Sequence, residues 1–315
     1  MISVIIATKN RANALRDISL PSLLKQTLSN FEILIWDASD STETEKVIQI
    51  FVPLFKNKGV FLRYYQAPRV GSCSQRNDAI KKVCGDVAFF MDDDMEISTK
   101  AIHDLQDLFS SFTWLMGATF PMLDLRYILP VKRNKIIRFF SRALAFFLFR
   151  AQKNSPFVFQ NERLSIKNMP GGCMACRVSI FNDLYFDERL EHFSTYAFSE
   201  DLDFSHRVFL HFKKPLLVLN QGFAIHHGAT GKRTSNCSTW SAMKFFNTRI
   251  MKENFEHYDG YAYSNWAFYR EQRVGMVINL LRDGCSIKDI IAGYFLYKKA
   301  YHAMRDSGVM ATWEA

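Results

Sequence analysis

The first 123 residues alternate short apolar runs with segments whose apolar side chains recur at helical spacing. Uninterrupted apolar runs predict buried strands, and recurrence every three to four residues predicts amphipathic helices. The predicted strands are residues 2–8, 31–36, 60–65, 86–91 and 114–120, and the predicted helices are residues 13–26, 44–55, 72–83 and 97–109. Pro21 lies inside the first helix and is expected to interrupt it. Alternating strands and helices predict an α/β fold with a doubly wound, mostly parallel sheet.

The remainder of the chain departs from this alternation. Residues 125–165 interrupt the pattern, and a further strand is predicted at residues 216–219. From residue 238 onward the spacing predicts helices at residues 240–255, 263–281 and 287–304. We therefore expect one domain of residues 1–234, with an insertion at about 125–165, and a helical C-terminal region of residues 235–315.

Three consecutive acidic residues, Asp92, Asp93 and Asp94, follow the fourth predicted strand directly. Adjacent carboxylates repel one another and are not buried without partners. Carboxylates at the carboxyl end of a central strand suit a hard divalent cation such as Mg2+ or Mn2+, and open α/β sheets bind their ligands at that edge. The alternative interpretation is an acidic loop or helix N-terminus, because Ser98 and Thr99 could cap a helix that runs to Phe109.

Polar segments also follow the other predicted strands. Residues 7–11 follow the first strand, Asp37 ends the second, and residues 69–77 lead into a helix. Neither a Gly-x-Gly-x-x-Gly fingerprint nor a P-loop is found. Asp37 suits a hydrogen bond to a nucleobase or ribose, or alternatively a helix cap. Arg76 is either a surface cation or a partner for the acidic run.

The charge and cysteine content restrict the partners and the compartment. The net charge is +9, from 40 Lys and Arg against 31 Asp and Glu, which favours anionic partners such as nucleotides, phosphates or an acidic membrane surface. Six cysteines without an export signal predict free thiols in the cytoplasm. Cys173 and Cys176 have the spacing of a zinc or redox pair, but a second pair at zinc spacing is missing. No apolar run reaches the roughly 18–20 residues of a membrane span.

Residues 132–150 predict a basic, aromatic, amphipathic helix without acidic residues. Lys135, Arg138 and Arg142 fall on one stripe, and apolar residues cover the other faces. Such a helix is typical of an interfacial membrane anchor. Packing on the sheet or on a partner subunit is the alternative.

Several motifs, taken in order, carry a resemblance to a known family. They are residues 3–11, Asp37, Gly71 with Arg76 and Asn77, the run Asp92–Asp94, and Ser199-Glu-Asp-Leu-Asp203. The set resembles the family 2 inverting glycosyltransferases with the GT-A fold, in particular bacterial rhamnosyltransferase-like members, over roughly residues 1–230. The resemblance implies a metal-dependent enzyme that moves one sugar from a nucleotide-diphosphate donor to a hydroxyl of a glycan or lipid-linked glycan, in bacterial surface polysaccharide synthesis.

The resemblance also implies roles for individual residues. Asp201 would be the general base, aided by Glu200, because inversion needs a carboxylate that accepts the acceptor proton; Asp203 is the less favoured alternative. The Mn2+ or Mg2+ ligands would be Asp92, Asp94 and His226 or His227. The donor-binding residues would be Thr8, Asn10, Arg11, Asp37, Arg76, Asp92, Asp93, Gly171, Gly172, Lys232 and Arg233. Ala38 and Asp78 depart from the family pattern, which leaves the nucleobase open.

Together with the predicted helix at 132–150, the resemblance implies a polyprenyl-linked or other glycan acceptor and a peripheral location on the inner face of the cell membrane. No nucleic-acid partner is expected. The Gln-x-x-Arg-Trp signature of processive synthases is missing, which favours single-sugar addition. Two rival functions remain. A sugar-nucleotide nucleotidyltransferase would usually carry a Gly-rich loop after the first strand, whereas residues 7–16 contain no glycine. The other rival is a non-catalytic basic peripheral membrane protein.

Overall fold

The computed structural model describes residues 1–124, 158–160, 163–219, 221–228, 236–259, 277, 280–281 and 284–307. These residues form two compact units. Unit 1 contains the described residues within Met1–Pro130, Ser155–Asp187 and Glu200–Thr230, and unit 2 contains those within Glu188–Ser199 and Gly231–Ala315. The segment Glu188–Ser199 thus belongs to unit 2, although it lies within the first 234 residues of the chain.

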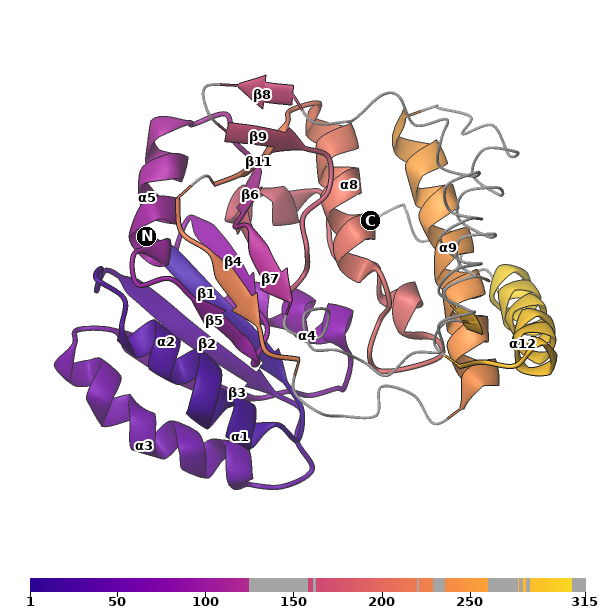
Figure 1. Ribbon diagram of the computed structural model, residues 1–315, viewed down its shortest axis with the longest axis horizontal. Helices are drawn as coiled ribbons and strands as arrows, with labels where there is room; N and C mark the ends of the chain where they lie inside the picture. The colour runs from indigo at the N-terminus through magenta and orange to yellow at the C-terminus, as the bar shows by residue number, and fades with distance from the viewer. Residues whose placement is uncertain are drawn as a thin grey trace, which may run out of the picture. The chain divides into compact units, whose positions relative to one another are not determined.

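Unit 1 is built on a nine-stranded sheet with the order β3-β2-β1-β4-β10-β6-β11-β9-β8 (Figure 1). The strands are β1 (Ile2–Thr8), β2 (Phe31–Asp37), β3 (Phe61–Gln66), β4 (Val87–Met91), β6 (Gly117–Thr119), β8 (Val158–Gln160), β9 (Arg163–Ile166), β10 (Cys173–Arg177) and β11 (Leu216–Val218). Strands β3, β2, β1 and β4 are mutually parallel, and β10 runs antiparallel to both of its neighbours. The predicted α/β fold with a mostly parallel sheet is confirmed.

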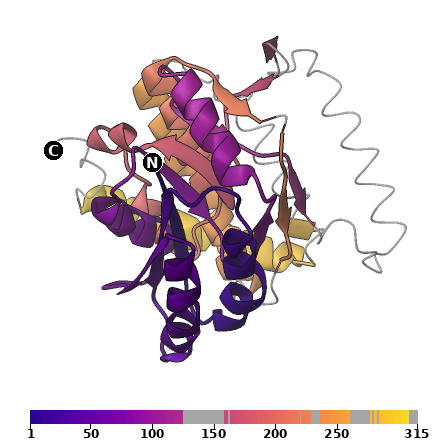
Figure 2. The same ribbon diagram turned by 90° about the vertical axis from the view of Figure 1, so that its left-hand side faces the viewer.

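Helices cover both faces of this sheet (Figures 1 and 2). The helices of unit 1 are α1 (Ala12–Ala14), α2 (Leu20–Leu24), α3 (Glu43–Asn57), α4 (Ser72–Ala79), α5 (Ala101–Ser111) and α8 (Glu200–Phe212), with 3-10 turns at Ile80–Lys82 and Val178–Asn182. Side chains alternate between the two faces of a strand. In β4, Phe89 therefore joins the core beneath α2, α3 and α5. Phe90 points the other way and packs on Phe186, which stacks on Phe204 of α8.

The first helical segment is divided where the sequence predicted a break. A π-helical turn, Leu15–Ser19, separates α1 from α2, and Pro21 lies in the first turn of α2. Proline has no amide hydrogen, so the carbonyl of Asp17 loses its usual partner four residues on. Just before the proline, the backbone N–H of Leu20 donates to the carbonyl of Leu15. This bond spans five residues, as in a π-turn, and not the four of an α-helix.

A second, three-stranded sheet in unit 1 corrects one prediction. Its order is β5 (Met95–Ile97), β12 (Ala224–His226) and β7 (Met122–Asp124). The sequence predicted a helix from Ile97 to Phe109, but residues 95–97 form a strand and α5 begins only at Ala101. Strand β5 pairs with β12, about 130 residues further along the chain. Local propensity could not reveal this pairing.

Unit 2 consists of helical elements in its described residues. They are a 3-10 turn (Glu188–Glu191), α9 (Cys237–Asp259) and α12 (Ile287–Asp306). Helices α9 and α12 lie side by side (Figure 1). A disulfide joins Cys237 to Cys285, across a Cα–Cα distance of 5.4 Å. The prediction that all cysteines are free thiols is therefore wrong for this pair, because the packing of two helix starts brings together residues 48 positions apart.

Some predictions fall on parts of the chain outside the described residues. These are the amphipathic helix at 132–150 with most of the insertion around it, the basic pair Lys232 and Arg233, and most of the helix predicted at 263–281. Among the helices that the structure does describe, none combines the length and the apolar character that crossing a membrane requires.

Gly293 sets how closely α12 approaches α9, which gives a test of the packing in unit 2. A Cβ at this position would lie 2.5 Å from the Cβ of Ser241 and 2.6 Å from the carbonyl oxygen of Ser238. Gly293→Ala should lower the free energy of unfolding by about 1–3 kcal/mol, because overpacking against backbone cannot relax. The exposed neighbour Ala292 supplies the control. If helix propensity alone decided the stability, Gly293→Ala would stabilise the protein, and Ala292→Gly would destabilise it by ~1 kcal/mol. Denaturant unfolding shows whether Gly293→Ala destabilises or stabilises the protein.

Candidate active site

Three parallel strands end at the same edge of the large sheet, and their ends carry the polar residues that the sequence singled out. Strand β1 ends at Thr8, β2 at Asp37, and β4 at Met91, directly before Asp92. The amide of Gln75, in α4, donates to the carbonyl oxygens of Thr8 (3.1 Å) and Trp36 (2.8 Å). These bonds hold the ends of β1 and β2 against α4, so the loops that follow them start from fixed positions.

Asp93 is the inward-facing member of the acidic run. Its carboxylate accepts a hydrogen bond from the Thr8 hydroxyl (2.6 Å) and lies 3.1 Å from Nε of Arg11. Burial raises the pKa of Asp93 to about 7, against the opposing effects of Arg11 and Thr8. The structure thus brings Thr8, Arg11 and Asp93 together, and their contacts hold the acidic run against the end of β1.

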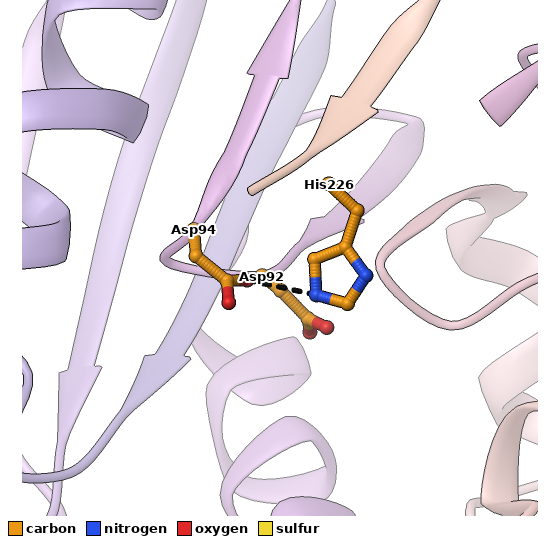
Figure 3. A group of neighbouring side chains, drawn as sticks. All are labelled: Asp92, Asp94 and His226. Atoms are coloured by element: carbon orange, nitrogen blue, oxygen red, sulfur yellow. Dashed lines mark ion pairs between the residues drawn. The ribbon is translucent and has the colours of Figure 1, made fainter. Parts of the chain in front are cut away.

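Asp92 and Asp94 form a group with His226, and Figure 3 shows the three side chains facing one another. One ligand atom from each residue lies within 4.8 Å of the others, and Nε2 of His226 is 3.2 Å from Oδ1 of Asp94. The pairing of β12 with β5 places His226 opposite Met95, next to the acidic run. His227 points elsewhere, since its Nε2 lies 2.9 Å from Oε2 of Glu96.

This group suits a divalent cation. Two carboxylates and an imidazole are ligands that Mn2+ and similar ions accept, and the spread of their atoms is close to twice a usual metal–ligand distance of about 2.1 Å. The sequence left the choice between His226 and His227 open, and the geometry puts His226 in the group. Guanidinium groups lie on both carboxylates: Nη2 of Arg11 is 2.5 Å from Asp94, and Nη2 of Arg76 is 3.2 Å from Asp92.

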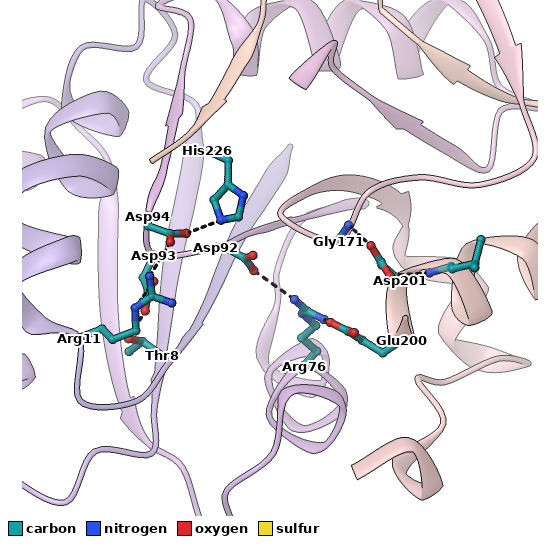
Figure 4. Close-up of polar contacts among 11 residues, drawn as sticks. Thr8, Arg11, Arg76, Asp92, Asp93, Asp94, Gly171, Glu200, Asp201 and His226 are labelled. Carbon is teal, nitrogen blue, oxygen red and sulfur yellow. Dashed lines mark hydrogen bonds and ion pairs between the residues drawn. The ribbon is translucent and has the colours of Figure 1, made fainter. Parts of the chain in front are cut away.

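Arg76 links the acidic run to helix α8 (Figure 4). Besides contacting Asp92, it donates from Nη1 to Oε1 of Glu200 at 2.8 Å, and its guanidinium lies 5.4 Å from the centre of the Phe186 ring. Both Arg76 and Glu200 are buried. Burial raises the pKa of Glu200 to about 7, while Arg76 opposes the shift and the nearby Asp201 adds to it. The side chain of Asn77 fixes this arrangement by exchanging two hydrogen bonds with the backbone of Phe186.

Asp201 lies in the first turn of α8, where two backbone N–H groups hold its carboxylate. Gly171 donates to Oδ2 at 2.7 Å, and Leu202 donates to Oδ1 at 2.8 Å. Burial raises the pKa of Asp201, and these two N–H groups oppose the shift. Asp203, the alternative considered from the sequence, is fully buried and lies 2.6 Å from Nη2 of Arg207. It therefore anchors α8.

The two glycines before β10 connect Asp201 with Asp92. Gly171 bonds Asp201, and the carbonyl of the next residue, Gly172, accepts from the backbone N–H of Asp92 at 3.2 Å. A Cβ on Gly171 would lie 2.8 Å from the Cβ of Asp201, and one on Gly172 would lie 3.1 Å from Oδ2 of Asp92. A side chain at position 171 would clash with Asp201, and one at position 172 would press on the carboxylate of Asp92, so the two glycines let this turn lie close to both acids.

Asp37 and Asn10, which the sequence singled out, are held in place by three residues that it did not, Ser39, Tyr64 and Asp40. The carboxylate of Asp37 is fully buried and accepts from the Ser39 backbone N–H (3.0 Å), the Ser39 hydroxyl and the Tyr64 hydroxyl (3.0 Å). Asn10 adopts a left-handed backbone with φ of 56° and exchanges side-chain bonds with Asp40. Asp37 and Asn10 thus lock the first two loops together.

The metal assignment makes a prediction that needs no substrate. His226→Ala and Asp94→Asn should each weaken Mn2+ binding at least about tenfold, since changes to outer-shell partners alone cost 10–100-fold. His227→Ala is the matched control, because its imidazole bonds Glu96 and should leave the affinity nearly unchanged. Calorimetric titration with Mn2+ measures all three. Equal losses in the two histidine variants would contradict the assignment.

A family model and several solved structures are similar to this chain. The family model described as Glycosyl transferase family 2 matches residues 3–185, and no curated protein matches the chain. S. aureus TarS 1-349 in complex with UDP-GlcNAc is similar in structure, with a TM-score of 0.53, 15% identity, and coverage of 96% of this chain and 91% of that one. This chain spans 50% of the length of the longer TarS structure.

Two further structures share the architecture. GalNAc-T7 with UDP, GalNAc and Mn2+ has a TM-score of 0.54 and 15% identity, with 88% of this chain and 54% of that chain covered. The mannosyltransferase PcManGT from Pyrobaculum calidifontis, in complex with GDP-Man and Mn2+, has a TM-score of 0.52 and 13% identity, with 99% and 84% covered. At these identities the likeness shows the GT-A fold alone. The family match covers more than half of the 315 residues, and the chain therefore belongs to glycosyl transferase family 2.

Proposed function

We propose that this protein is a metal-dependent inverting glycosyltransferase that moves one sugar from a nucleotide-diphosphate donor to a hydroxyl of a glycan acceptor. The observation that carries the proposal is the turn Gly171-Gly172, which bonds Asp201 on one side and Asp92 on the other. The candidate proton acceptor Asp201 and the candidate metal ligand Asp92 are thus bonded to adjacent residues of one turn. The similar structures that contain UDP-GlcNAc or GDP-Man support a donor of this class.

In this proposal Asp92, Asp94 and His226 would hold the cation, which would offset the charge of the donor diphosphate. Mn2+ and Mg2+ both suit the carboxylates, and the imidazole favours Mn2+. Arg11 and Arg76 add positive charge on either side of the acidic group. Fixed positive groups stabilise the charge that develops on a leaving diphosphate.

Asp201 would accept the proton of the acceptor hydroxyl while that oxygen attacks the anomeric carbon from the face opposite the diphosphate. The bond from the acceptor oxygen to the anomeric carbon forms as the bond to the diphosphate oxygen breaks, so the configuration inverts. The raised pKa of Asp201 suits this role, because a more basic carboxylate takes up a proton more readily near neutral pH. Glu200, held by Arg76, would orient the acceptor.

The pathway and location are further parts of the proposal. A lipid-linked glycan acceptor in bacterial surface polysaccharide synthesis would agree with the net charge of +9 and the basic segment 132–150. A peripheral position on the inner face of the cell membrane would follow. Lys232 and Arg233 would assist at the diphosphate.

Asp201→Asn tests the proton acceptor. The amide keeps the size of the side chain but cannot take a proton, so turnover should fall about 10²–10⁴-fold. Binding of Mn2+ and of the nucleotide diphosphate, measured by calorimetry, should remain as in the unaltered protein. An active Asp201→Asn variant, or loss of metal binding together with activity, would refute the assigned role.

The reaction products separate the rival functions. Transfer releases the nucleotide diphosphate, whereas a nucleotidyltransferase releases or consumes pyrophosphate, and chromatography of the nucleotides distinguishes them. A binding protein gives neither product. The anomeric proton of the product, observed by NMR, reports inversion or retention relative to the donor.

The pH dependence of kcat/KM gives an independent test. Asp201 must be deprotonated to act as base, so kcat/KM should fall as the pH decreases through its raised pKa. We expect this acid limb above the ordinary aspartate range near pH ~4. Because burial also raises the pKa of Glu200 and of Asp93 to about 7, the profile should be repeated in Glu200→Gln and in Asp93→Asn. A limb that survives in both variants belongs to Asp201, and a profile that is flat down to the ordinary range would contradict the assignment.

A further inference from the structure

Helix α12 in unit 2 carries an exposed apolar stripe on its first three turns. Ile287, Ile291 and Phe295 are 67%, 52% and 66% exposed. Residues four apart in a helix lie one above the other, so these three side chains form a continuous strip. Leu296 is also exposed beside them. We call these four residues the α12 stripe. Such a strip is costly in water, and contiguous exposed apolar residues mark interaction surfaces.

The opposite face of α12 shows that the helix itself is firmly placed within unit 2. Ile290, Gly293, Tyr297 and Met304 are buried, and α12 packs along α9. A capping box orders the first turn, with Asp289 N–H donating to the Ser286 hydroxyl and the Asp289 carboxylate accepting from the backbone N–H of Ser286. The α12 stripe is therefore presented by a fixed helix whose packing on α9 does not use it.

Basic side chains accompany the stripe. Lys288, Lys298 and Lys299 are all exposed on α12. Helix α12 carries four basic residues, Lys288, Lys298, Lys299 and Arg305, against two acidic ones, Asp289 and Asp306, so its charge stays positive. Long lysine side chains can extend their ammonium groups past a buried apolar strip toward charged headgroups. An apolar strip bordered by lysines is the pattern of a helix that lies in a membrane interface.

We propose that the α12 stripe and its lysines form a docking surface for an anionic membrane. Charge complementarity selects this occupant, since acidic lipid headgroups attract the lysines. A second copy of the chain, placed face to face, would set lysines against lysines. The inference goes beyond the proposed function, because lipid binding requires neither a sugar donor nor catalysis. It also involves a different segment from residues 132–150.

The apolar part of the proposal is tested with the full chain and vesicles of phosphatidylcholine mixed with phosphatidylglycerol. The double variant Ile291→Ser, Phe295→Ser should partition into floating vesicles at least about tenfold less than the unaltered protein. The matched control is Ile50→Ser, Leu54→Ser, which removes an exposed pair of the same spacing on α3. This control should bind as the unaltered protein does. Both pairs are exposed, so thermal unfolding should show a folded protein in each case.

The electrostatic part uses charge reversal. Lys298→Glu, Lys299→Glu should weaken binding at least about 25-fold at low salt, since each basic residue near an anionic surface contributes about fivefold. Lys81→Glu, Lys82→Glu changes the charge equally at another exposed lysine pair and is the control. Vesicles of phosphatidylcholine alone should bind the unaltered protein weakly, and added salt should weaken binding to the mixed vesicles.

Three outcomes would overturn the proposal. The first is that the unaltered protein fails to bind mixed vesicles. The second is that both α12 variants bind them as well as their controls do, which would assign membrane binding to another segment. Sedimentation without lipid could also show a dimer that the Ile291→Ser, Phe295→Ser variant loses, which would make a second copy the occupant. Transfer to a water-soluble acceptor, assayed on the same variants, should be unchanged. A failure of docking is therefore distinguishable from a failure of the proposed enzymatic activity.

Discussion

Charge compensation at one edge of the large sheet is the constraint on which the site depends. The carboxylates gathered there belong to Asp92, Asp93, Asp94, Glu200 and Asp201. Arg11 lies against two of them and Arg76 against two others. A buried charge without a partner costs several kcal/mol, so the acidic edge is compatible with a folded protein because these guanidinium groups lie within it. The same compensation leaves a compact group of ligand atoms that suits a divalent cation.

The environments of these acids separate their roles. Asp93 faces inward onto Thr8 and braces the loop, whereas Asp92 and Asp94 face His226. Asp201 is distinguished from the other acids by backbone donors instead of a cation. Burial raises the pKa of Asp201 although its two backbone donors oppose the shift, and these donors keep the carboxylate in a fixed position. The acidic run thus supplies both a structural contact and two candidate metal ligands, and the first turn of α8 supplies the candidate base.

Unit 2 supplies features of a different kind, which bear on the proposed membrane docking and not on the chemistry. Its helices α9 and α12 are held by close packing at Gly293 and by the disulfide between Cys237 and Cys285. These constraints fix α12 through one face and leave an apolar, lysine-bordered strip on the other. A transferase that acts on a lipid-linked acceptor would need to stay close to the bilayer. The proposed membrane docking through α12 and the proposed chemistry in unit 1 are nevertheless separable properties.

The sequence alone determined the features that depend on local pattern. Apolar runs located β1, β2 and β4, and the acidic residues directly after β4 marked the edge where a ligand would bind. Tertiary structure decided the features that depend on distant pairing. The choice of His226 over His227, and the strand Met95–Ile97 that delays the start of the following helix to Ala101, both follow from the pairing of β5 with β12. The disulfide likewise follows from the packing of α9 on α12. Neither kind of contact is recorded in local periodicity, because its free energy comes from residues far apart in the chain.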